Sequence, residues 1–207
     1  MFTFIRIIFY STIVKFFSYF FIGLNIHNKE NLPKGPSVIV ANHNSHLDTL
    51  IIISLFKSKD IPKVKAVGAA DYFFKNKIFA FFSKNLIGVI PIERKKKSSD
   101  ILDSIYNALD EGNIVIIFPE GTRGTKEKLA PFKNGISKIA MKYPDIPFVP
   151  IILSGLRRSL PKGKFLIVPF VTNVYIEKSH YFNKNRVEFI QSLYSTFKEM
   201  LDKEKNI

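Results

Sequence analysis

Two residues with the chemistry of a catalytic pair, His43 and Asp48, follow a short apolar run at residues 37–41. An imidazole can take a proton from a hydroxyl group, and a nearby carboxylate can fix its tautomer and stabilise the imidazolium. On one continuous helix, five positions correspond to about 500°, so the two side chains would not share a face. They can meet only if His43 lies in the turn that leaves a strand and Asp48 lies in the first turn of the next helix. The same residues are equally compatible with an ordinary turn in which Asp48 stabilises a helix start.

Two more apolar runs are followed by residues that could bind an anion. The run at residues 86–92 leads to Arg94, whose guanidinium group could hold a phosphate through two parallel hydrogen bonds. Three lysines follow at residues 95–97, and by themselves they indicate a solvated or lipid-facing basic patch. The run at residues 114–118 leads into the loop Pro-Glu-Gly-Thr-Arg-Gly at residues 119–124, whose glycines let the backbone approach a ligand and offer N–H groups.

A fourth apolar run, at residues 148–152, contains Pro150. Proline cannot donate a ladder hydrogen bond, so this run is predicted to be an edge strand or the wall of a site. The pattern G-x-x-x-x-G-K-[ST] does not occur in the chain, which excludes the phosphate-binding loop of nucleoside triphosphatases.

The composition limits the chemistry that these residues can carry out. The chain has 207 residues, which suits one domain with a sizeable core, and it has no cysteine. Disulfides, thiolate metal sites and a cysteine nucleophile are therefore excluded. Acyl or phosphoryl chemistry must then use oxygen or imidazole groups, and direct transfer without an acyl-enzyme fits this composition.

The chain is strongly basic, with 31 lysines and arginines against 17 aspartates and glutamates and a formal charge of +14. Such a charge favours an anionic partner: nucleic acid, an acidic lipid surface, a phosphorylated substrate or an acidic protein. A surface on which lysine is simply the common solvated residue would give the same excess. No recognised nucleic-acid motif occurs and the lysines are scattered among apolar runs, so we expect no nucleic-acid partner.

Apolar runs alternate with amphipathic segments along the chain, which predicts an α/β layer structure with function at the strand ends. The expected strands are residues 37–41, 64–70, 86–92, 114–118, 148–153 and 165–176. The expected helices are residues 47–56, 72–83, 98–109, 134–142 and 186–205. The strand at 114–118 is continuously apolar and is predicted to be buried on both faces.

Residues 1–24 form an apolar, phenylalanine-rich segment that is roughly long enough to cross a bilayer. On a helix Arg6 and Lys15 fall on opposite faces, and a spanning helix would hold Lys15 near its centre only at a large energetic cost. We therefore expect one helix, or two short helices broken near residues 11–12, that lies in one leaflet with its cations at the head groups. A spanning helix is the main alternative, whereas a signal peptide would need a small-residue cleavage site that does not follow here.

Taken in order, the polar segments and the proline-containing run resemble the four sequence blocks of the glycerolipid, or lysophospholipid, acyltransferase family. The blocks are Asn42-His43-x-x-x-x-Asp48, then Gly88 to Arg94, then Phe118-Pro119-Glu120-Gly121-Thr122-Arg123, and finally Val149-Pro150. The turn at residues 161–163 resembles a later Pro-Lys-Gly turn of the family. The resemblance covers roughly residues 30–170, and the joint occurrence of the four blocks in this order is highly specific.

The resemblance implies a role for each matching residue. His43 would be the general base, and Asp48 would be its orienting partner. The phosphate and the glycerol of the acceptor would be surrounded by Arg94, Glu120, Gly121, Thr122 and Arg123. Because a carboxylate repels a phosphate, Glu120 is expected to bind a glycerol hydroxyl group or to hold Arg94 or Arg123. His46 matches no family position and is expected to be a turn or helix-cap residue.

Two segments depart from the family pattern. Residues 67–71 read Val-Gly-Ala-Ala-Asp where many members carry a lysine, so the acceptor contacts of that lysine are not carried over to this chain. The segment after Val174 lacks the Gly-x-Pro that many members show, so the last strand is expected to end differently.

The resemblance also implies a fold and a reaction. The expected fold is a single layered α/β acyltransferase domain over residues 27–207, with a mixed β-sheet flanked by helices. A membrane-anchoring helical segment over residues 1–26 would precede it. The expected reaction moves a fatty acyl group from acyl-CoA or an acyl carrier protein thioester to a lysophospholipid, 1-acyl-glycerol 3-phosphate. It gives phosphatidic acid and uses no metal or other cofactor.

The expected place of action is the cytoplasmic face of the cytoplasmic membrane, where a monotopic or peripheral protein would meet an anionic membrane surface. Two other functions stay open. The enzyme could acylate another lyso-lipid, such as a lyso-ornithine lipid or a lysophospholipid with a larger head group. A non-catalytic protein of the same fold could bind membrane lipid, although such a protein would have no need of the base His43.

Overall fold

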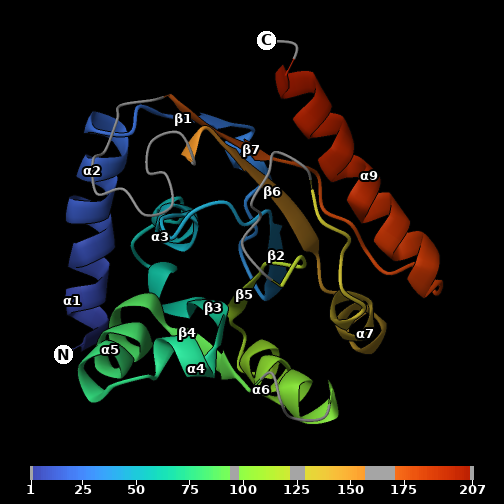
Figure 1. The fold of residues 1–207 in the computed structure, drawn as a ribbon, viewed down its shortest axis with the longest axis horizontal. Coiled ribbons are helices and arrows are strands. Elements are labelled where there is room, and N and C mark those ends of the chain that lie inside the picture. Colours follow the sequence, from blue (N-terminus) through green and yellow to red (C-terminus); the bar gives the residue numbers. More distant parts are fainter. Residues whose placement is uncertain (1, 94–97, 122–128, 157–170, 206–207) are drawn as a thin grey trace.

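The computed structural model of the protein describes residues 2–93, 98–121, 129–156 and 171–205. Within these residues, seven strands form one sheet in the order β1-β7-β6-β2-β5-β3-β4. The strands are β1 (Leu24–His27), β2 (Ser37–Ala41), β3 (Val64–Ala69), β4 (Val89–Ile92), β5 (Ile114–Ile117), β6 (Phe148–Ser154) and β7 (Thr172–Ile176). All neighbouring strands run parallel except β6 and β7, so the sheet is mixed, as predicted (Figure 1).

Strand β2 shows how the sequence produces a core on each face of the sheet. Successive side chains of a strand point to opposite faces, so Val38 and Val40 join one hydrophobic cluster while Ile39 and Ala41 join the other. Every residue of β5 is also buried, which confirms that this strand is covered on both faces. Parallel strands of this kind need helices on both sides of the sheet.

Helices do cover both faces (Figure 1). One face carries α3 (Asp48–Ser54) and the N-terminal helical segment, which consists of α1 (Phe2–Ile8), the π-helical turn η1 (Phe9–Val14) and α2 (Lys15–Phe20). The other face carries α6 (Ser98–Asp110), α7 (Gly135–Lys142) and α9 (Arg186–Lys205). The three layers confirm the α/β prediction.

The N-terminal helical segment is one continuous helical stretch, the first of the two predicted forms, and residues 11–12 lie in its π-helical part η1. The segment packs on α3 through the buried side chains of Tyr10 and Val14. Among the described residues, Phe2–Phe20 is the one helical stretch whose length and composition would allow it to cross a membrane. The sheet begins directly afterwards, since β1 starts at Leu24 and pairs with β7.

The predicted edge strand at Pro150 is wrong, because β6 lies inside the sheet between β7 and β2. The carbonyl oxygen of Pro150 accepts the N–H of Glu177, 2.9 Å away. In a strand, the N–H and the C=O of one residue point toward the same neighbouring strand. The side of Pro150 that lacks an N–H therefore faces β7, and it does so just beyond Ile176, the last residue of β7. The ladder between β6 and β2 loses no hydrogen bond.

The aromatic stretch expected as one helix at residues 72–83 is divided into α4 (Ala70–Phe73), α5 (Lys77–Phe82) and the π-helical turn η4 (Ser83–Ile87). Asn76 causes the division, because its side-chain oxygen accepts the N–H of Phe79 at 2.8 Å and caps a new helix. The last expected strand, at 165–176, begins outside the described residues, and its described part is β7.

Candidate active site

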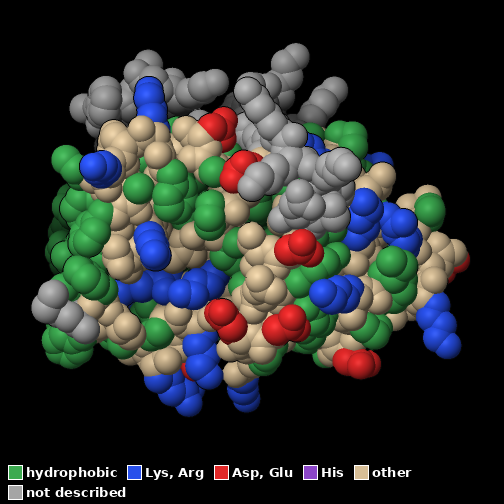
Figure 2. Space-filling model, turned by 90° about the horizontal axis from the view of Figure 1, so that it is seen from below, with side chains coloured by type: hydrophobic (Ala, Val, Ile, Leu, Met, Phe, Trp, Pro, Cys, Tyr) green, Lys and Arg blue, Asp and Glu red, His purple; other side chains and the backbone are tan. Residues whose placement is uncertain are grey.

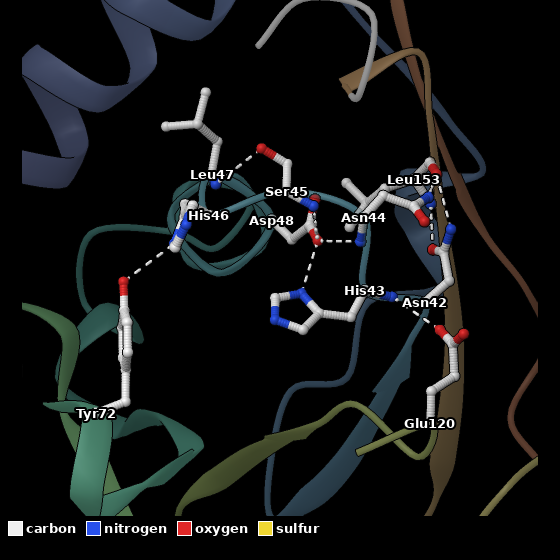
Figure 3. A network of polar contacts seen from close by, with 10 residues as sticks. All are labelled: Asn42, His43, Asn44, Ser45, His46, Leu47, Asp48, Tyr72, Glu120 and Leu153. Carbon is white, nitrogen blue, oxygen red and sulfur yellow. Dashed lines mark hydrogen bonds and ion pairs between the residues drawn. The ribbon is translucent and has the colours of Figure 1, made fainter. Parts of the chain in front are cut away.

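The carboxyl ends of β2, β5 and β6 meet at one edge of the sheet, because β2 pairs in parallel with both other strands. Asn42 and His43 follow β2 directly, Phe118 follows β5, and Leu153 lies near the end of β6. In open α/β sheets, ligands bind in the crevice outside the carboxyl ends of the strands. Residues from distant parts of the sequence therefore converge at the edge where such a fold binds its substrate (Figure 3).

Asp48 is fully buried in the first turn of α3, and one of its oxygens has three partners. Oδ2 accepts the backbone N–H groups of Asn44 at 2.7 Å and Ser45 at 2.8 Å, and it lies 2.8 Å from Nδ1 of His43 (Figure 3). Oδ1 has no hydrogen-bond partner among the described residues. The turn position of His43 and the helical position of Asp48 confirm the geometry that their spacing required.

These contacts decide which nitrogen of His43 carries a proton. A carboxylate oxygen that faces two backbone N–H groups can only accept, so Nδ1 of His43 must donate its proton to Oδ2 of Asp48. Nε2 is then left with a free lone pair. The side chain of His43 is 22% exposed, which gives that nitrogen access to a bound hydroxyl group. The pair therefore has the chemistry of a general base with an orienting carboxylate.

Glu120 holds the backbone of His43. Its side chain is 6% exposed; Oε1 accepts the N–H of His43 at 3.0 Å, and Oε2 accepts the N–H of Ala130 at 3.1 Å. These bonds join the loop after β5 to the loop after β2. Burial and two backbone partners indicate a positioning role, and the expected contact with a glycerol hydroxyl group stays a prediction. The expected contacts with Arg94 or Arg123 lie outside the described residues.

Phe118 covers one face of the imidazole of His43. The two rings stack with their centroids 4.1 Å apart and their planes inclined by 24°. Together with the bond to Asp48, this contact limits the rotation of the imidazole. The face of an aromatic ring also attracts a cation, which favours the imidazolium that forms when His43 takes a proton. The sequence placed Phe118 in the third block but suggested no role for it.

Asn42 continues the contact between β2 and β6 beyond the last residue of β2. Its Nδ2 donates to the carbonyl oxygen of Leu153 at 2.9 Å, and its Oδ1 accepts the N–H of Leu153 at 2.8 Å. The side-chain amide thus imitates a backbone partner and fixes the residue immediately before His43. Sequence reasoning gave Asn42 no role, although its place beside His43 in the first block was a signal.

The remaining predicted residues have different outcomes. Gly121 lies in the described loop with a φ of +73°, in the left-handed region that favours glycine. His46 lies in the turn before α3, as expected. The predicted features that lie outside the described residues are Arg94, the lysines at 95–97, Thr122, Arg123 and the turn at 161–163.

A buried Asp–His pair at the carboxyl edge of a mixed sheet, with one imidazole nitrogen free to take a proton, defines a protein that can activate a hydroxyl group. Residues 23–154, more than half of the chain, match the model of the family described as Acyltransferase. The matched range includes His43, Asp48, Phe118 and Glu120. The chain belongs to the acyltransferase family, which confirms the resemblance read from its four blocks.

Curated relatives share one activity in their names. A chloroplastic 1-acyl-sn-glycerol-3-phosphate acyltransferase of Brassica napus is 34% identical over 153 residues, which cover 70% of this chain and 41% of the relative. A probable 1-acyl-sn-glycerol-3-phosphate acyltransferase of Mycoplasma pneumoniae is 32% identical over 133 residues, which cover 63% of this chain and 48% of the relative. The matched part of the chain thus spans less than half the length of these two relatives.

A solved structure shares the fold. The crystal structure of the 1-acyl-sn-glycerophosphate acyltransferase PlsC from Thermotoga maritima matches with a TM-score of 0.78 at 22% identity. The match covers 97% of this chain and 81% of the other. This likeness confirms the predicted α/β fold with helices on both faces of a mixed sheet.

Proposed function

We propose that the chain transfers a fatty acyl group from a thioester, carried by CoA or by an acyl carrier protein, to the free hydroxyl group of 1-acyl-glycerol 3-phosphate. The product is phosphatidic acid. The observation that carries the proposal is the buried Asp48–His43 pair, which leaves Nε2 of His43 as a base. Two relatives whose names state this acceptor support the choice of substrate. The net charge of +14 suits a phosphorylated acceptor and an acidic or phosphorylated donor.

In the proposed reaction, Nε2 of His43 takes the proton of the acceptor hydroxyl group while the hydroxyl oxygen attacks the thioester carbonyl carbon. An ester C–O bond forms, and the C–S bond breaks when the tetrahedral intermediate collapses. The leaving thiolate takes the proton from Nε2, which restores the neutral imidazole. Asp48 stabilises the imidazolium between these steps. A positioned base contributes about 10²–10⁴-fold to the rate, and alignment of the two substrates supplies much of the rest. No step requires a metal or an organic cofactor.

The N-terminal helical segment is proposed to lie in one leaflet, on the cytoplasmic face of the cytoplasmic membrane. Arg6 supports this placement, because it is 4% exposed and, among the described residues, its side chain donates to backbone carbonyl oxygens alone. The acceptors are the carbonyl oxygens of Pro62 (3.2 Å), Val64 (2.5 Å), Leu86 (2.8 Å) and Ile87 (3.0 Å). They lie at the start of β3 and just before β4, so a helix that crossed the bilayer would have to abandon all of them.

Exposed side chains on this segment and on α5 offer a surface that suits lipid. We name them the apolar face; its members are Phe2, Phe4, Ile5, Ile8, Ile13, Phe16 and Phe20 on the segment, and Ile78, Phe79, Phe81 and Phe82 on α5. Phe2 and Phe81 join the two elements, with ring centroids 5.2 Å apart. Figure 2 shows hydrophobic side chains gathered along the flank where α1 and α5 lie, with lysines and arginines beside them. An apolar surface beside cations suits an anionic bilayer.

Aromatic contacts lead from the apolar face to the candidate active site. The ring centroids of Phe79 and Tyr72 are 5.8 Å apart, and those of Tyr72 and His46 are 6.0 Å apart. His46 belongs to the turn between His43 and Asp48 (Figure 3). In the proposed arrangement the catalytic pair therefore receives its acceptor directly from the bilayer, where both the acceptor and the product reside.

The activity is tested with the full chain purified in detergent. Thiol release is measured from acyl-CoA, and separately from acyl carrier protein thioester, with 1-acyl-glycerol 3-phosphate as the acceptor. We expect turnover in the parent protein and a loss of about 10²–10⁴-fold in kcat for His43→Ala. Turnover only with another lyso-lipid would keep the mechanism and change the substrate. The absence of turnover with every acceptor would favour a lipid-binding protein.

The placement in one leaflet is tested by site-specific labelling, which is clean because the chain has no cysteine of its own. Thr3→Cys and Lys203→Cys, made one at a time, are exposed to a membrane-impermeant maleimide added to either side of sealed vesicles. Both sites are expected to react from the cytoplasmic side. Reaction from opposite sides would mean that the segment crosses the membrane.

A further inference from the structure

Lys133 lies beside the candidate active site, although no sequence pattern pointed to it. Its backbone N–H donates to the carbonyl oxygen of Pro119 at 2.9 Å, which fixes residue 133 next to the loop after β5. The same loop carries Phe118, which stacks on His43, and Glu120, which accepts the N–H of His43. Lys133 is therefore attached, through its main chain, to the loop that contacts the base.

The side chain of Lys133 lies across Gly121. A Cβ atom built on Gly121 would be 2.5 Å from Nζ, 2.6 Å from Cε and 2.9 Å from Cδ of Lys133. Real Cβ atoms do not make contacts this short, so the absence of a side chain at Gly121 is what leaves room for the lysine. The φ of +73° at Gly121 is a second reason for a glycine. The ammonium group is thereby held against the residue next to Glu120.

This ammonium group has its charge available for a ligand. Within the part of the chain that the structure describes, no oxygen is bonded to or ion-paired with Nζ of Lys133. The neighbouring carboxylate, Glu120, is buried and accepts the N–H groups of His43 and Ala130. An exposed lysine is a compact point charge that binds phosphate without a fixed orientation.

We propose that Lys133 binds the phosphate group of the acceptor and so sets the preference for a phosphorylated lyso-lipid. This assignment rests on the proposed acyl transfer. The phosphate and the free hydroxyl group of 1-acyl-glycerol 3-phosphate are on neighbouring carbons, so one molecule must reach the cation and the base together. The hydrogen bond from the N–H of His43 to Glu120, the residue next to Gly121, ties the loop under Lys133 to the backbone of His43. Lys133 is thus a binding residue whose loss weakens acceptor binding and spares the chemical step.

The test compares Lys133→Met with the parent protein in detergent, with KM measured separately for the acceptor and for the donor. The KM for 1-acyl-glycerol 3-phosphate is expected to rise by about 10- to 100-fold, with kcat and the donor KM little changed. The backbone contact of residue 133 with Pro119 survives this change. Lys34→Met is the matched control, because Lys34 is also exposed but precedes β2, at the opposite end of that strand from His43.

A second variant tests the place of Lys133 over Gly121. Gly121→Ala puts a Cβ atom where Nζ lies, so it should raise the acceptor KM in the same direction. Combined with Lys133→Met, it should raise the acceptor KM little further, because both changes remove one contact, while the strain at the φ of +73° should lower the Tm alike in both backgrounds. Effects that simply add would contradict the idea that Gly121 serves to seat Lys133.

Three results would overturn the assignment of Lys133 alone: an unchanged acceptor KM, a rise confined to the donor KM, or a loss of kcat with a lower Tm. A rise confined to the donor KM would assign the ammonium group of Lys133 to the phosphates of the donor. A loss of kcat with a lower Tm would give Lys133 a structural role. A parent protein that acylates another lyso-lipid but not 1-acyl-glycerol 3-phosphate would overturn the proposed substrate, and the assignment with it.

Discussion

The backbone N–H of His43 donates to Oε1 of Glu120 at 3.0 Å, although 77 positions separate the two residues in the chain. The other oxygen of Glu120 accepts the N–H of Ala130 at 3.1 Å. A buried carboxylate thus joins the loop that carries the base to the loop after β5. The structure supports a role for Glu120 that is exerted through His43.

Glu120→Gln keeps the size of the side chain but turns one acceptor oxygen into an NH₂ donor that faces an N–H group. We expect kcat to fall by about 10- to 100-fold through misplacement of the base, with little change in the acceptor KM. The free energy of unfolding should fall by about 1–3 kcal/mol. Steady-state kinetics and thermal unfolding measure both, with the exposed Glu199→Gln as the control. A raised acceptor KM at unchanged kcat would instead support the contact with a glycerol hydroxyl group.

Asp48→Asn removes the charge that stabilises the imidazolium of His43 but preserves an oxygen that can accept the N–H groups of Asn44 and Ser45. The expected result is a fall in kcat of about 10²-fold or more, with KM values close to those of the parent protein. The same substitution at the exposed Asp145 should leave kcat unchanged. Full activity in Asp48→Asn would show that the base works without its carboxylate partner.

Phe118→Leu keeps an apolar side chain beside His43 and removes the aromatic face. The imidazole then has more freedom and loses a favourable contact with its protonated form, worth about 0.5–2 kcal/mol. We expect kcat to fall by about 3- to 30-fold with an unchanged Tm in detergent. Phe182→Leu, on the opposite face of the sheet, serves as the control. A large drop in Tm would show that Phe118 acts chiefly as a packing residue.

Arg6→Met removes the side-chain donors to four backbone carbonyl oxygens. Because these acceptors lie at the start of β3 and before β4, the loss should loosen the N-terminal helical segment from the sheet. The expected cost is about 2–4 kcal/mol in the free energy of unfolding, seen as a Tm lower by about 5 °C or more. Lys15→Met, in the same segment, should shift the Tm much less. Equal Tm values for the two variants would contradict the anchoring role of Arg6.

His180 predicts a pH dependence of stability. Its Nδ1 lies 3.3 Å from Oγ of Ser192 and its Nε2 lies 3.1 Å from Oγ1 of Thr196, and burial lowers the pKa of His180 below its ordinary value. The unfolded chain therefore binds this proton more readily than the folded protein. The stability from neutral His180 is present at neutral pH and is lost as the pH falls below about 6.5.

When the pH is lowered from about 7 to about 5, the Tm of His180→Gln should consequently fall less than the Tm of the parent protein. Thermal unfolding at a series of pH values measures the two slopes. Parallel slopes in the two proteins would mean that His180 does not contribute to the acid sensitivity.

Local patterns in the sequence determined much of the fold. The apolar run of β2 was located at its observed bounds, and the continuous run of β5 was correctly predicted to be buried on both faces, because a strand's own residues report which faces are covered. The spacing of His43 and Asp48 restricted them to a turn followed by a helix, which is the observed arrangement. The prediction of one helix at residues 72–83 was wrong, because the side chain of Asn76 caps the start of a new helix there.

Contacts between distant segments were decided only by the tertiary structure. No local pattern places Glu120 against the backbone of His43 or Lys133 across Gly121, since both contacts depend on which strands are neighbours. The place of Pro150 inside the sheet was also decided by the tertiary structure. A proline is tolerated there because the side that lacks an N–H faces the end of the next strand. The sequence by itself determined which residue types are present for the chemistry and at what spacing; the order and register of the strands decided which other residues hold them in place.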